Sequence, residues 1–385
     1  MKSRALTTMR EAAVLRSAAR LQARAATLCS QGRCDKARGI AERALALLEE
    51  RFGEQHASVA ELLDTLASVE ETAERRDLAQ QHYLRALRVL ENVTQDADTA
   101  RVRVGVLRHL GSLHTSMGDY DAAEPRLRAA LELAESALGA RDVERALCRN
   151  DLAVLYKFTG KFTEAARLYR RALALARTTF AEGDPALATI YHNLGGLEHA
   201  RGRYRAGEPY ARRSVEIREH VLGPDHPDVA ADVAAHAAIL DGLERYSESE
   251  PMYLRALAIF EKAFGADHYE VGMNLGNLAA VYHATGRAQE AEDMYLRALA
   301  IKRKRLGPRH PDVAFTLNNL AFLHQSEGRP RRAAALYRRA CAIFERALGR
   351  THPNTQVCRA NLAELMSTLE RGEAQKRSGR RARKR

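Results

Sequence analysis

The sequence contains no tryptophan, and proline, glycine and aromatic residues are sparse. Proline and glycine interrupt helices, whereas aromatic and β-branched residues are the ones that strands prefer. Alanine, leucine, arginine and glutamate dominate instead, and all four are good helix formers. The composition therefore predicts an all-α protein.

The chain also lacks any apolar run long enough to span a bilayer. No short apolar core follows the first basic residues, as it would in a secretory signal. We therefore expect a soluble protein of the cytoplasm with no membrane span.

Acidic residues are scarce at the two ends of the chain. Residues 1–24 carry six basic groups and one acidic group, and residues 371–385 carry eight and one. These segments contribute +5 and +7 to the net charge of +12, so residues 25–370 are close to neutral. The excess positive charge belongs to the ends and not to the body.

A repeat of 42 residues, with two extra residues before Gly118, runs through the neutral body. One turn of each repeat is marked by Gly32, Glu74, Gly118, Gly160, Gly202, Glu244, Gly286 and Gly328. A second turn recurs at Gly139, Gly223, Gly265, Gly307 and Gly349, often within Leu-Gly-x-x-His-Pro. Two turns per period, with apolar periodicity between them, indicate two antiparallel helices per repeat.

Three positions of every repeat carry a small residue. The first position holds Ala25, Ala67, Gly111, Ala153, Gly195, Ala237, Ala279 and Ala321, and the other two follow twelve and nineteen residues later. Such positions are where helices cross too closely for a larger side chain. A leucine precedes the first position in six repeats, but Arg24 and His236 replace it in the first and sixth, where we expect less regular packing.

This pattern resembles the tetratricopeptide repeat, and its long period is similar to the kinesin-light-chain kind. Leu317–Ala321, Tyr337–Ala340 and Leu306–Pro311 carry the likeness, which covers about residues 25–365. The resemblance implies a right-handed α-solenoid of about eight helix-turn-helix repeats over residues 25–370. A kinesin light chain also has a long heptad coiled coil before its repeats, and no such heptad pattern occurs here.

The two basic ends have separate interpretations. Residues 1–24 have the arginine-rich composition of a mitochondrial transit peptide, but Leu15, Leu21 and Leu28 lead directly into the first helix pair. This continuity favours a capping helix. Residues 371–385 contain no apolar anchor and are predicted to be a disordered tail. Such a tail could bind nucleic acid or acidic lipid, serve as a nuclear signal, or merely improve solubility.

No catalytic signature is present, neither a phosphate-binding loop nor a His-Glu-x-x-His pair nor a nucleophile elbow. His226, His268, His310 and His352 recur once per repeat, so their copies lie about 10 Å apart and cannot share a metal ion. Cys29 and Cys34 flank a turn without a second Cys/His pair, and the other three cysteines occupy apolar positions. We expect no enzyme activity, no small-molecule substrate, no cofactor and no metal.

A polar residue recurs just before the conserved leucine of the first helix. The position and the one before it hold Asn150, Asp151, His192, Asn193, Asn277, Asn318, Asn319 and Asn361. Asparagine has mediocre helix propensity, so its recurrence inside helices needs a reason. In tetratricopeptide arrays the first helices line the concave groove, and the resemblance implies amides that hold the backbone of an extended peptide. The alternative is that these amides tie neighbouring helices together.

A second polar column follows on the same helices, at Lys157, His199, His283 and Gln325. It could set a charge preference in the groove, although a solvated helix face explains it equally well. The arginines at positions such as Arg255 and Arg297 lie on the second helix and are expected to make contacts between repeats.

The leading functional hypothesis is a scaffold or adaptor whose groove binds a protein or peptide partner. One alternative is a sensor that regulates a nucleotide-binding signalling protein, because long repeats of this kind also occur attached to nucleotide-binding switch domains. Another is a nucleic-acid-associated protein that acts through its basic tail.

Overall fold

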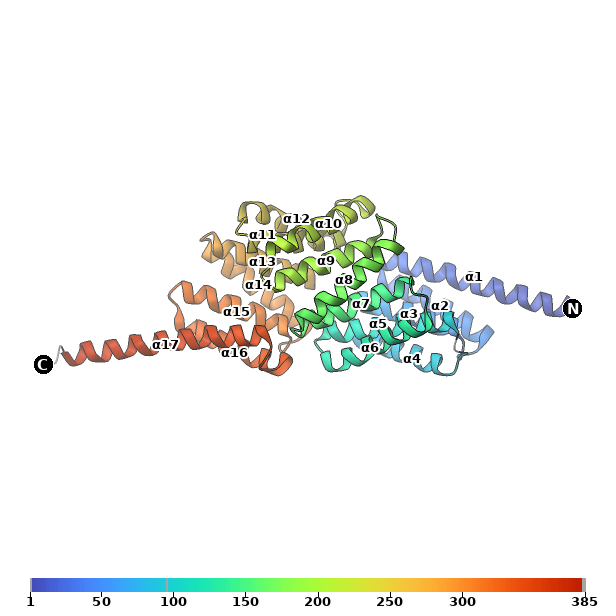
Figure 1. Cartoon of the computed structure of the whole chain (residues 1–385), viewed down its shortest axis with the longest axis horizontal. Coiled ribbons are helices and arrows are strands. Elements are labelled where there is room, and N and C mark those ends of the chain that lie inside the picture. Colours follow the sequence, from blue (N-terminus) through green and yellow to red (C-terminus); the bar gives the residue numbers. More distant parts are fainter. Residues whose placement is uncertain (1, 95, 383–385) are drawn as a thin grey trace. The chain divides into compact units, whose positions relative to one another are not determined.

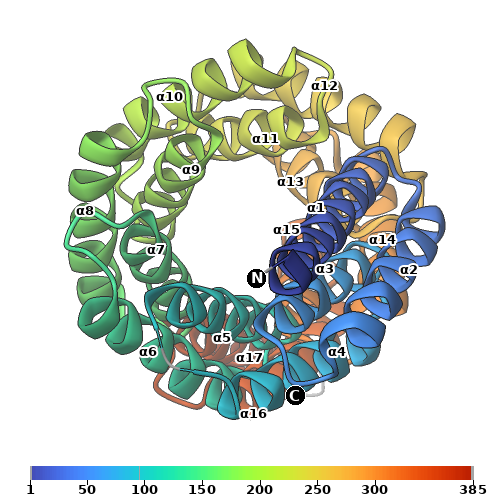
Figure 2. The same ribbon diagram turned by 90° about the vertical axis from the view of Figure 1, so that its right-hand side faces the viewer.

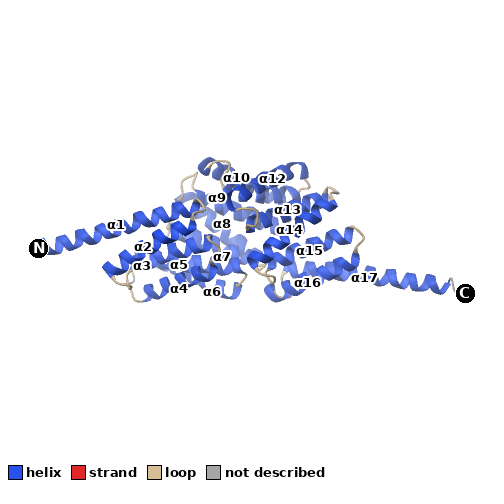
Figure 3. Ribbon diagram, turned by 180° about the vertical axis from the view of Figure 1, so that it is seen from behind, coloured by secondary structure: helices blue, strands red, loops and turns tan. Residues whose placement is uncertain are grey.

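The computed structural model describes residues 2–94 and 96–382, and all regular structure in that part of the chain is helical (Figures 1 and 3). The helices are α1 Lys2–Ser30, α2 Cys34–Phe52, α3 Ala57–Thr72, α4 Arg76–Glu91, α5 Ala97–Met117, α6 Tyr120–Ala137, α7 Val143–Phe158, α8 Phe162–Thr179, α9 Pro185–Ala200, α10 Tyr204–Leu222, α11 Pro227–Gly242, α12 Tyr246–Phe264, α13 Tyr269–Ala284, α14 Ala288–Leu306, α15 Pro311–Ser326, α16 Pro330–Leu348 and α17 Pro353–Ala382. The first sixteen helices follow one another as eight pairs, which confirms the predicted all-α repeat array. Helix α17 occupies the position of the first helix of a further pair, and no second helix follows it among the described residues.

The chain divides into two compact units. Unit 1 comprises residues 1–155 and 164–181, and unit 2 comprises residues 156–163 and 182–385. Within unit 2 the first helices of the pairs, α9, α11, α13 and α15, line the inner side of the curve, and the second helices line the outer side (Figure 2). Unit 1 has the same arrangement, with α3, α5 and α7 on its inner side (Figure 2).

The small residues lie where the two helices of a pair cross. Ala67, Ala153, Ala237, Ala279 and Ala321 are completely buried. At the same position in α5 a Cβ added to Gly111 would lie 2.6 Å from the side chain of Leu127 in α6. This distance is shorter than any ordinary carbon contact, so the close crossing predicted from the pattern is confirmed.

The turns follow from their residues as well. Gly223 has a φ of 82° at the end of α10, a conformation that glycine adopts without steric cost. Glu74 and Glu244 replace the turn glycine in two repeats and both have a φ of 60°. These glutamates keep the left-handed turn geometry, although it is less favourable for them than for glycine.

The recurring histidines cap the helices that follow them. In His56, His226, His268, His310 and His352 the Nδ1 atom accepts a hydrogen bond from the backbone N–H two residues ahead. This contact satisfies one of the free N–H groups in the first turn of a helix. The structural interpretation of these histidines is therefore confirmed, and it requires an unprotonated Nδ1.

The ends differ from the sequence prediction in two respects. Residue 24 marks no boundary, because α1 continues without interruption to Ser30 and pairs with α2. Helix α17 extends through Ala382, so residues 371–382 are helical where a disordered tail was expected, and residues 383–385 lie outside the described part. The alanines, arginines and glutamate of this segment favour a helix, whereas Gly372 and Gly379 oppose it.

The two departures from the leucine pattern have different consequences. Arg24 is exposed on α1, whereas α11 remains a continuous helix around His236 and buries Ala237 completely. The less regular packing expected for the sixth repeat is therefore not seen at this position. Among the described residues, no helix is both long and apolar enough to cross a membrane.

The cysteines behave as the sequence suggested. Cys148, Cys341 and Cys358 are buried, and all five cysteines are free thiols. The sulfur atoms of Cys29 and Cys34 lie 3.1 Å apart across the first turn. Within the described residues, no group of three or more histidine, cysteine or acidic side chains could hold a metal ion.

Candidate functional site

The twelve predicted groove residues all lie on first-position helices of the pairs. Asn150, Asp151 and Lys157 are on α7; His192, Asn193 and His199 on α9; Asn277 and His283 on α13; Asn318, Asn319 and Gln325 on α15; and Asn361 on α17. Asn150 and Asp151 belong to unit 1 and the other ten to unit 2. The two sets are described separately because each unit is a body of its own.

In unit 1, Asn150 and Asp151 are engaged in contacts between helices. The Nδ2 of Asn150, which is buried, donates to Asp151 Oδ1 at 2.9 Å, and Arg108 Nη1 on α5 donates to Asp151 Oδ2 at 2.9 Å. Burial opposes the charge of Arg108, but the carboxylates of Asp151 and Glu144 outweigh it and raise the pKa of the guanidinium group. Asp151 therefore ties α5 to α7, which is the helix-tying role weighed as the alternative to peptide binding.

In unit 2 the residues Asn193, Asn277, Asn319 and Asn361 form a recurring series on the inner helices, which we call the amide column. All four side chains are half-buried. Asn277 and Asn361 have no hydrogen-bond partner among the described residues, so their amides are available to a ligand. An amide carries both a donor and an acceptor, and it can therefore pair with a peptide group in the manner of a backbone.

The amides on α15 are partly committed to the fold. A side-chain hydrogen bond joins Asn319 to Tyr295 of α14, where burial raises the pKa of the tyrosine and this bond partly counteracts it. Asn318 Nδ2 lies 3.4 Å from Asn319 Oδ1, and Asn318 Oδ1 is buried without a partner among the described residues. A buried amide oxygen without a partner is costly, so Asn318 lowers the stability of this part of the fold.

Lys157 brings positive charge to the end of α7, close to His199 on α9. Burial lowers the pKa of Lys157 to about 8, and no ion pair with an acidic residue stabilises its charge among the described contacts. Burial and the neighbouring charge of Lys157 both lower the pKa of His199. A Cβ added to Gly196 would lie 3.4 Å from Lys157 Nζ, so the glycine leaves room for this lysine against α9. An acidic group of a ligand would find an uncompensated cation here.

Around α13 and α15 the inner helices carry an exposed aromatic side chain that the sequence analysis missed. Phe322 is 54% exposed, and its ring centroid lies 5.3 Å from that of His283. His283 Nε2 also contacts Ser326 Oγ at 2.8 Å, while Gln325 Oε1 is buried without a partner among the described atoms. The signal was available, because the other seven repeats carry alanine, glycine, serine or valine at the position of Phe322. Polar groups and an apolar surface thus meet at this end of the amide column.

His192 has a different role from the one predicted for it. Its Nδ1 lies 2.7 Å from Asp232 Oδ1, and Arg218 Nε donates to Asp232 Oδ2 at 2.6 Å. Asp232 is only 1% exposed, and Arg218 is also buried. We call Arg218, Asp232 and His192 the buried ion cluster, which connects α9, α10 and α11. Its sequence signal was Asp232, an acid where sister repeats hold residues such as Leu62, Val106 or Ile190.

The comparisons with known proteins agree with this architecture. A family model described as tetratricopeptide repeat matches residues 16–92, 102–178, 186–262, 231–304, 270–346 and 312–377. A search of curated proteins finds no match for the sequence.

Several solved structures resemble the chain. One from Podosopora anserina with kinesin-light-chain TPR-like repeats is 24% identical, with 52% of this chain and 95% of that chain covered and a TM-score of 0.41. A Rap protein in complex with Competence and Sporulation Factor is 13% identical, with coverage of 92% and 99% and a TM-score of 0.59. A signal transduction ATPase with a tetratricopeptide repeat sensor, from Pyrococcus horikoshii, is 14% identical, with coverage of 87% and 54% and a TM-score of 0.53. At these identities the likeness concerns the fold alone.

Proposed function

This chain belongs to the tetratricopeptide repeat family, and on that premise we propose that it is an interaction scaffold that holds an extended segment of a partner protein along the amide column of unit 2. The observation that carries the proposal is the pair of half-buried asparagines, Asn277 and Asn361, whose amides have no partner among the described residues. Asparagine inside a helix lowers stability relative to alanine. Hydrogen bonding to the backbone of a bound segment would explain why asparagine is present at these positions.

The surroundings of the column suggest what kind of segment it takes. Lys157, with its lowered pKa and no acidic partner among the described contacts, favours an acidic residue at one end of the segment. Phe322 and the exposed Phe315 on α15 offer apolar contact at the other end. We therefore expect an extended segment with an acidic residue and, several positions away, an apolar side chain.

The test uses the full chain immobilised on beads to capture partners from a cell extract, with mass spectrometry as the readout. Replacing both Asn277 and Asn361 by alanine removes up to two hydrogen bonds per bound segment, so capture should weaken about 5- to 150-fold. Gln81→Ala removes an exposed amide from the outer helix α4 and serves as the matched control. Helicity and Tm should be nearly unchanged in both variants.

The results separate the two interpretations of the column. Loss of capture with a native Tm supports the proposal. Loss of capture together with helicity would mean that the asparagines are structural, and full capture by the double variant would contradict peptide binding at this column. A triple variant at Asn193, Asn277 and Asn319 extends the test to Asn319, which bonds Tyr295, and to Asn193, which also has an interaction within the fold.

Two of the similar solved structures support a second candidate function, that of a sensor. The Pyrococcus horikoshii protein is described as an ATPase with a tetratricopeptide repeat sensor, and the Rap structure contains a bound factor, so both relate this fold to signalling. If the chain is a sensor, adding it to its ATPase partner should change the rate of ATP hydrolysis. An unchanged rate with a captured ATPase would exclude this role and leave the scaffold.

A further inference from the structure

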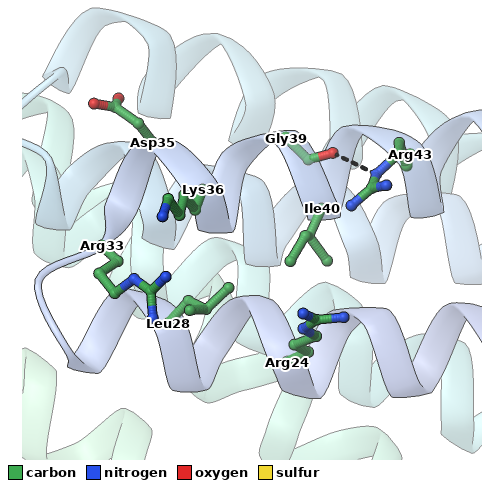
Figure 4. A pocket seen from close by; sticks show the side chains of 8 residues that line it. All are labelled: Arg24, Leu28, Arg33, Asp35, Lys36, Gly39, Ile40 and Arg43. Carbon is green, nitrogen blue, oxygen red and sulfur yellow. Dashed lines mark hydrogen bonds between the residues drawn. The ribbon is translucent and has the colours of Figure 1, made fainter.

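A pocket lies between α1 and α2 in unit 1, on a surface distinct from the amide column (Figure 4). Its lining residues are Arg24, Leu28, Arg33, Asp35, Lys36, Gly39, Ile40 and Arg43. Four of them are cations and only Asp35 is acidic. Asp35 is already committed, because its Oδ1 accepts from Arg75 Nη1 at 2.9 Å.

The four cations have no acidic partner. No ion pair involves Arg24, Arg33, Lys36 or Arg43 among the described residues, and all four are exposed. Among the described contacts of these four side chains, Arg43 Nε donates a hydrogen bond to the carbonyl oxygen of Gly39. The pocket thus combines uncompensated positive charge with the apolar side chains of Leu28 and Ile40.

Two repeats of unit 2 show which side chains pair with arginines at the repeat positions of Arg33 and Arg43. In the sixth repeat, Arg245 donates to Glu208 at 2.8 Å and Arg255 donates to Glu219 at 2.7 Å. The seventh repeat has the same pair of contacts, from Arg287 to Glu250 at 2.7 Å and from Arg297 to Glu261 at 2.6 Å. In each case both glutamates come from the second helix of the preceding repeat and lie eleven residues apart.

Arg33 and Arg43 occupy these same two repeat positions in the first repeat. In contrast to the sixth and seventh repeats, no glutamate among the described residues pairs with either of these two arginines. Arg24 adds a further exposed cation to this face. It occupies the position at which the second repeat has the buried Leu66. The exposed face of the first repeat therefore has the charges that an acidic helix satisfies further along the array.

We infer that this face binds an acidic amphipathic helix of a partner protein. Two carboxylates eleven residues apart, which is about three helical turns and hence one side of the helix, pair with Arg33 and Arg43. An apolar side chain between them contacts Leu28 and Ile40. This surface works independently of the amide column, and the two can be tested separately.

The chain itself supplies a probe with the required spacing. A fluorescent peptide with the sequence of residues 246–264 carries Glu250 and Glu261, and its fluorescence anisotropy reports binding to the full chain. Replacing Arg33 and Arg43 by glutamine should weaken binding about 2- to 30-fold, the range for two exposed ion pairs. A peptide with E250Q and E261Q should lose affinity to the same extent, and added salt should weaken the wild-type pair.

Matched controls come from the same two repeat positions. Arg203 and Arg339 have no ion pair among the described residues, so R203Q/R339Q should leave binding unchanged. N277A/N361A should also leave it unchanged, which keeps this test separate from that of the amide column. A charge exchange, R33E/R43E with a peptide carrying E250R and E261R, should restore binding.

Three outcomes would overturn the inference. They are the absence of peptide binding, binding that R33Q/R43Q leaves unaltered, and failure of the charge exchange to restore it. A single-stranded oligonucleotide that binds more tightly than the peptide, and loses its affinity in R33Q/R43Q, would instead identify the face as a nucleic-acid surface. R33Q/R43Q should fold normally, because neither side chain contacts an acidic residue in the described chain.

Discussion

Removal of Asp232 is the most informative single substitution in unit 2. This carboxylate is 1% exposed and accepts hydrogen bonds from Arg218 at 2.6 Å, while His192 Nδ1 lies 2.7 Å away. In Asp232→Ala the guanidinium group of Arg218 remains buried without that partner. Asp228, which is exposed, lies 3.5 Å from Arg218 and compensates only in part.

The expected cost follows from the burial of this cluster. Breaking a buried ion pair by removing one partner typically destabilises a protein by about 3–5 kcal/mol, and the residual contact with Asp228 places the expectation near the lower end. The control is Glu219→Gln, which breaks the exposed pair with Arg255 and should cost no more than about 1 kcal/mol.

The assay is urea unfolding followed by circular dichroism, combined with hydrogen exchange. Because repeat arrays unfold in segments, the loss of protection in D232A should be largest in α9, α10 and α11. Replacing Arg218 by methionine and Asp232 by leucine together should recover most of the stability, since no buried charge remains. A loss in D232A as small as that in E219Q would refute the reasoning that the cluster is electrostatically coupled.

Two further predictions concern titration. Burial lowers the pKa of His82, His114, His199, His236, His283, His324 and His352. Below the unfolded value of about 6.5 the unfolded chain therefore binds more protons, so the Tm should fall as the pH drops below that value, and a constant Tm would contradict these shifts. Lys157 has a pKa of about 8, so at pH 8 its uncharged fraction should be about a hundred times that of an ordinary lysine. Acetic anhydride reacts with the uncharged amine and should therefore acylate Lys157 preferentially. Mass spectrometry of digested protein measures the rate as a function of pH, which separates the pKa from reagent access, and a rate that still rises up to about pH 10.4 would show that the pKa of Lys157 is ordinary.

The amide column shows how much of the candidate site the repeat pattern of the sequence could predict. Recurrence at multiples of 42 residues is enough to place Asn193, Asn277, Asn319 and Asn361 on corresponding helices. It did not distinguish Asn319, which bonds Tyr295, from Asn277, which has no partner among the described residues. That distinction depends on whether a side chain of another helix comes within hydrogen-bond distance. The spacing of residues in the sequence does not contain this information.

Burial was even less visible in the sequence. His192 and Asn193 are adjacent and equally polar, yet His192 contacts the buried Asp232 of α11. Likewise, Arg255 and Arg43 share one repeat position, but Arg255 binds Glu219 and Arg43 has no acidic partner among the described residues. The difference arises because α10 places Glu219 beside Arg255, whereas no described acidic side chain pairs with Arg43.

By itself, the sequence determined that this protein is a series of helix pairs, where their turns lie and where the helices cross most closely. These properties are local or periodic, because glycine conformations, caps and small crossing residues act within one repeat. Only the tertiary structure decided which polar groups are satisfied. The structure separated the amides of Asn277 and Asn361 from the buried ion cluster and identified Arg33 and Arg43 as arginines without acidic partners. Those outcomes depend on contacts between side chains of different helices, many of them in neighbouring repeats, which form only when the repeats stack.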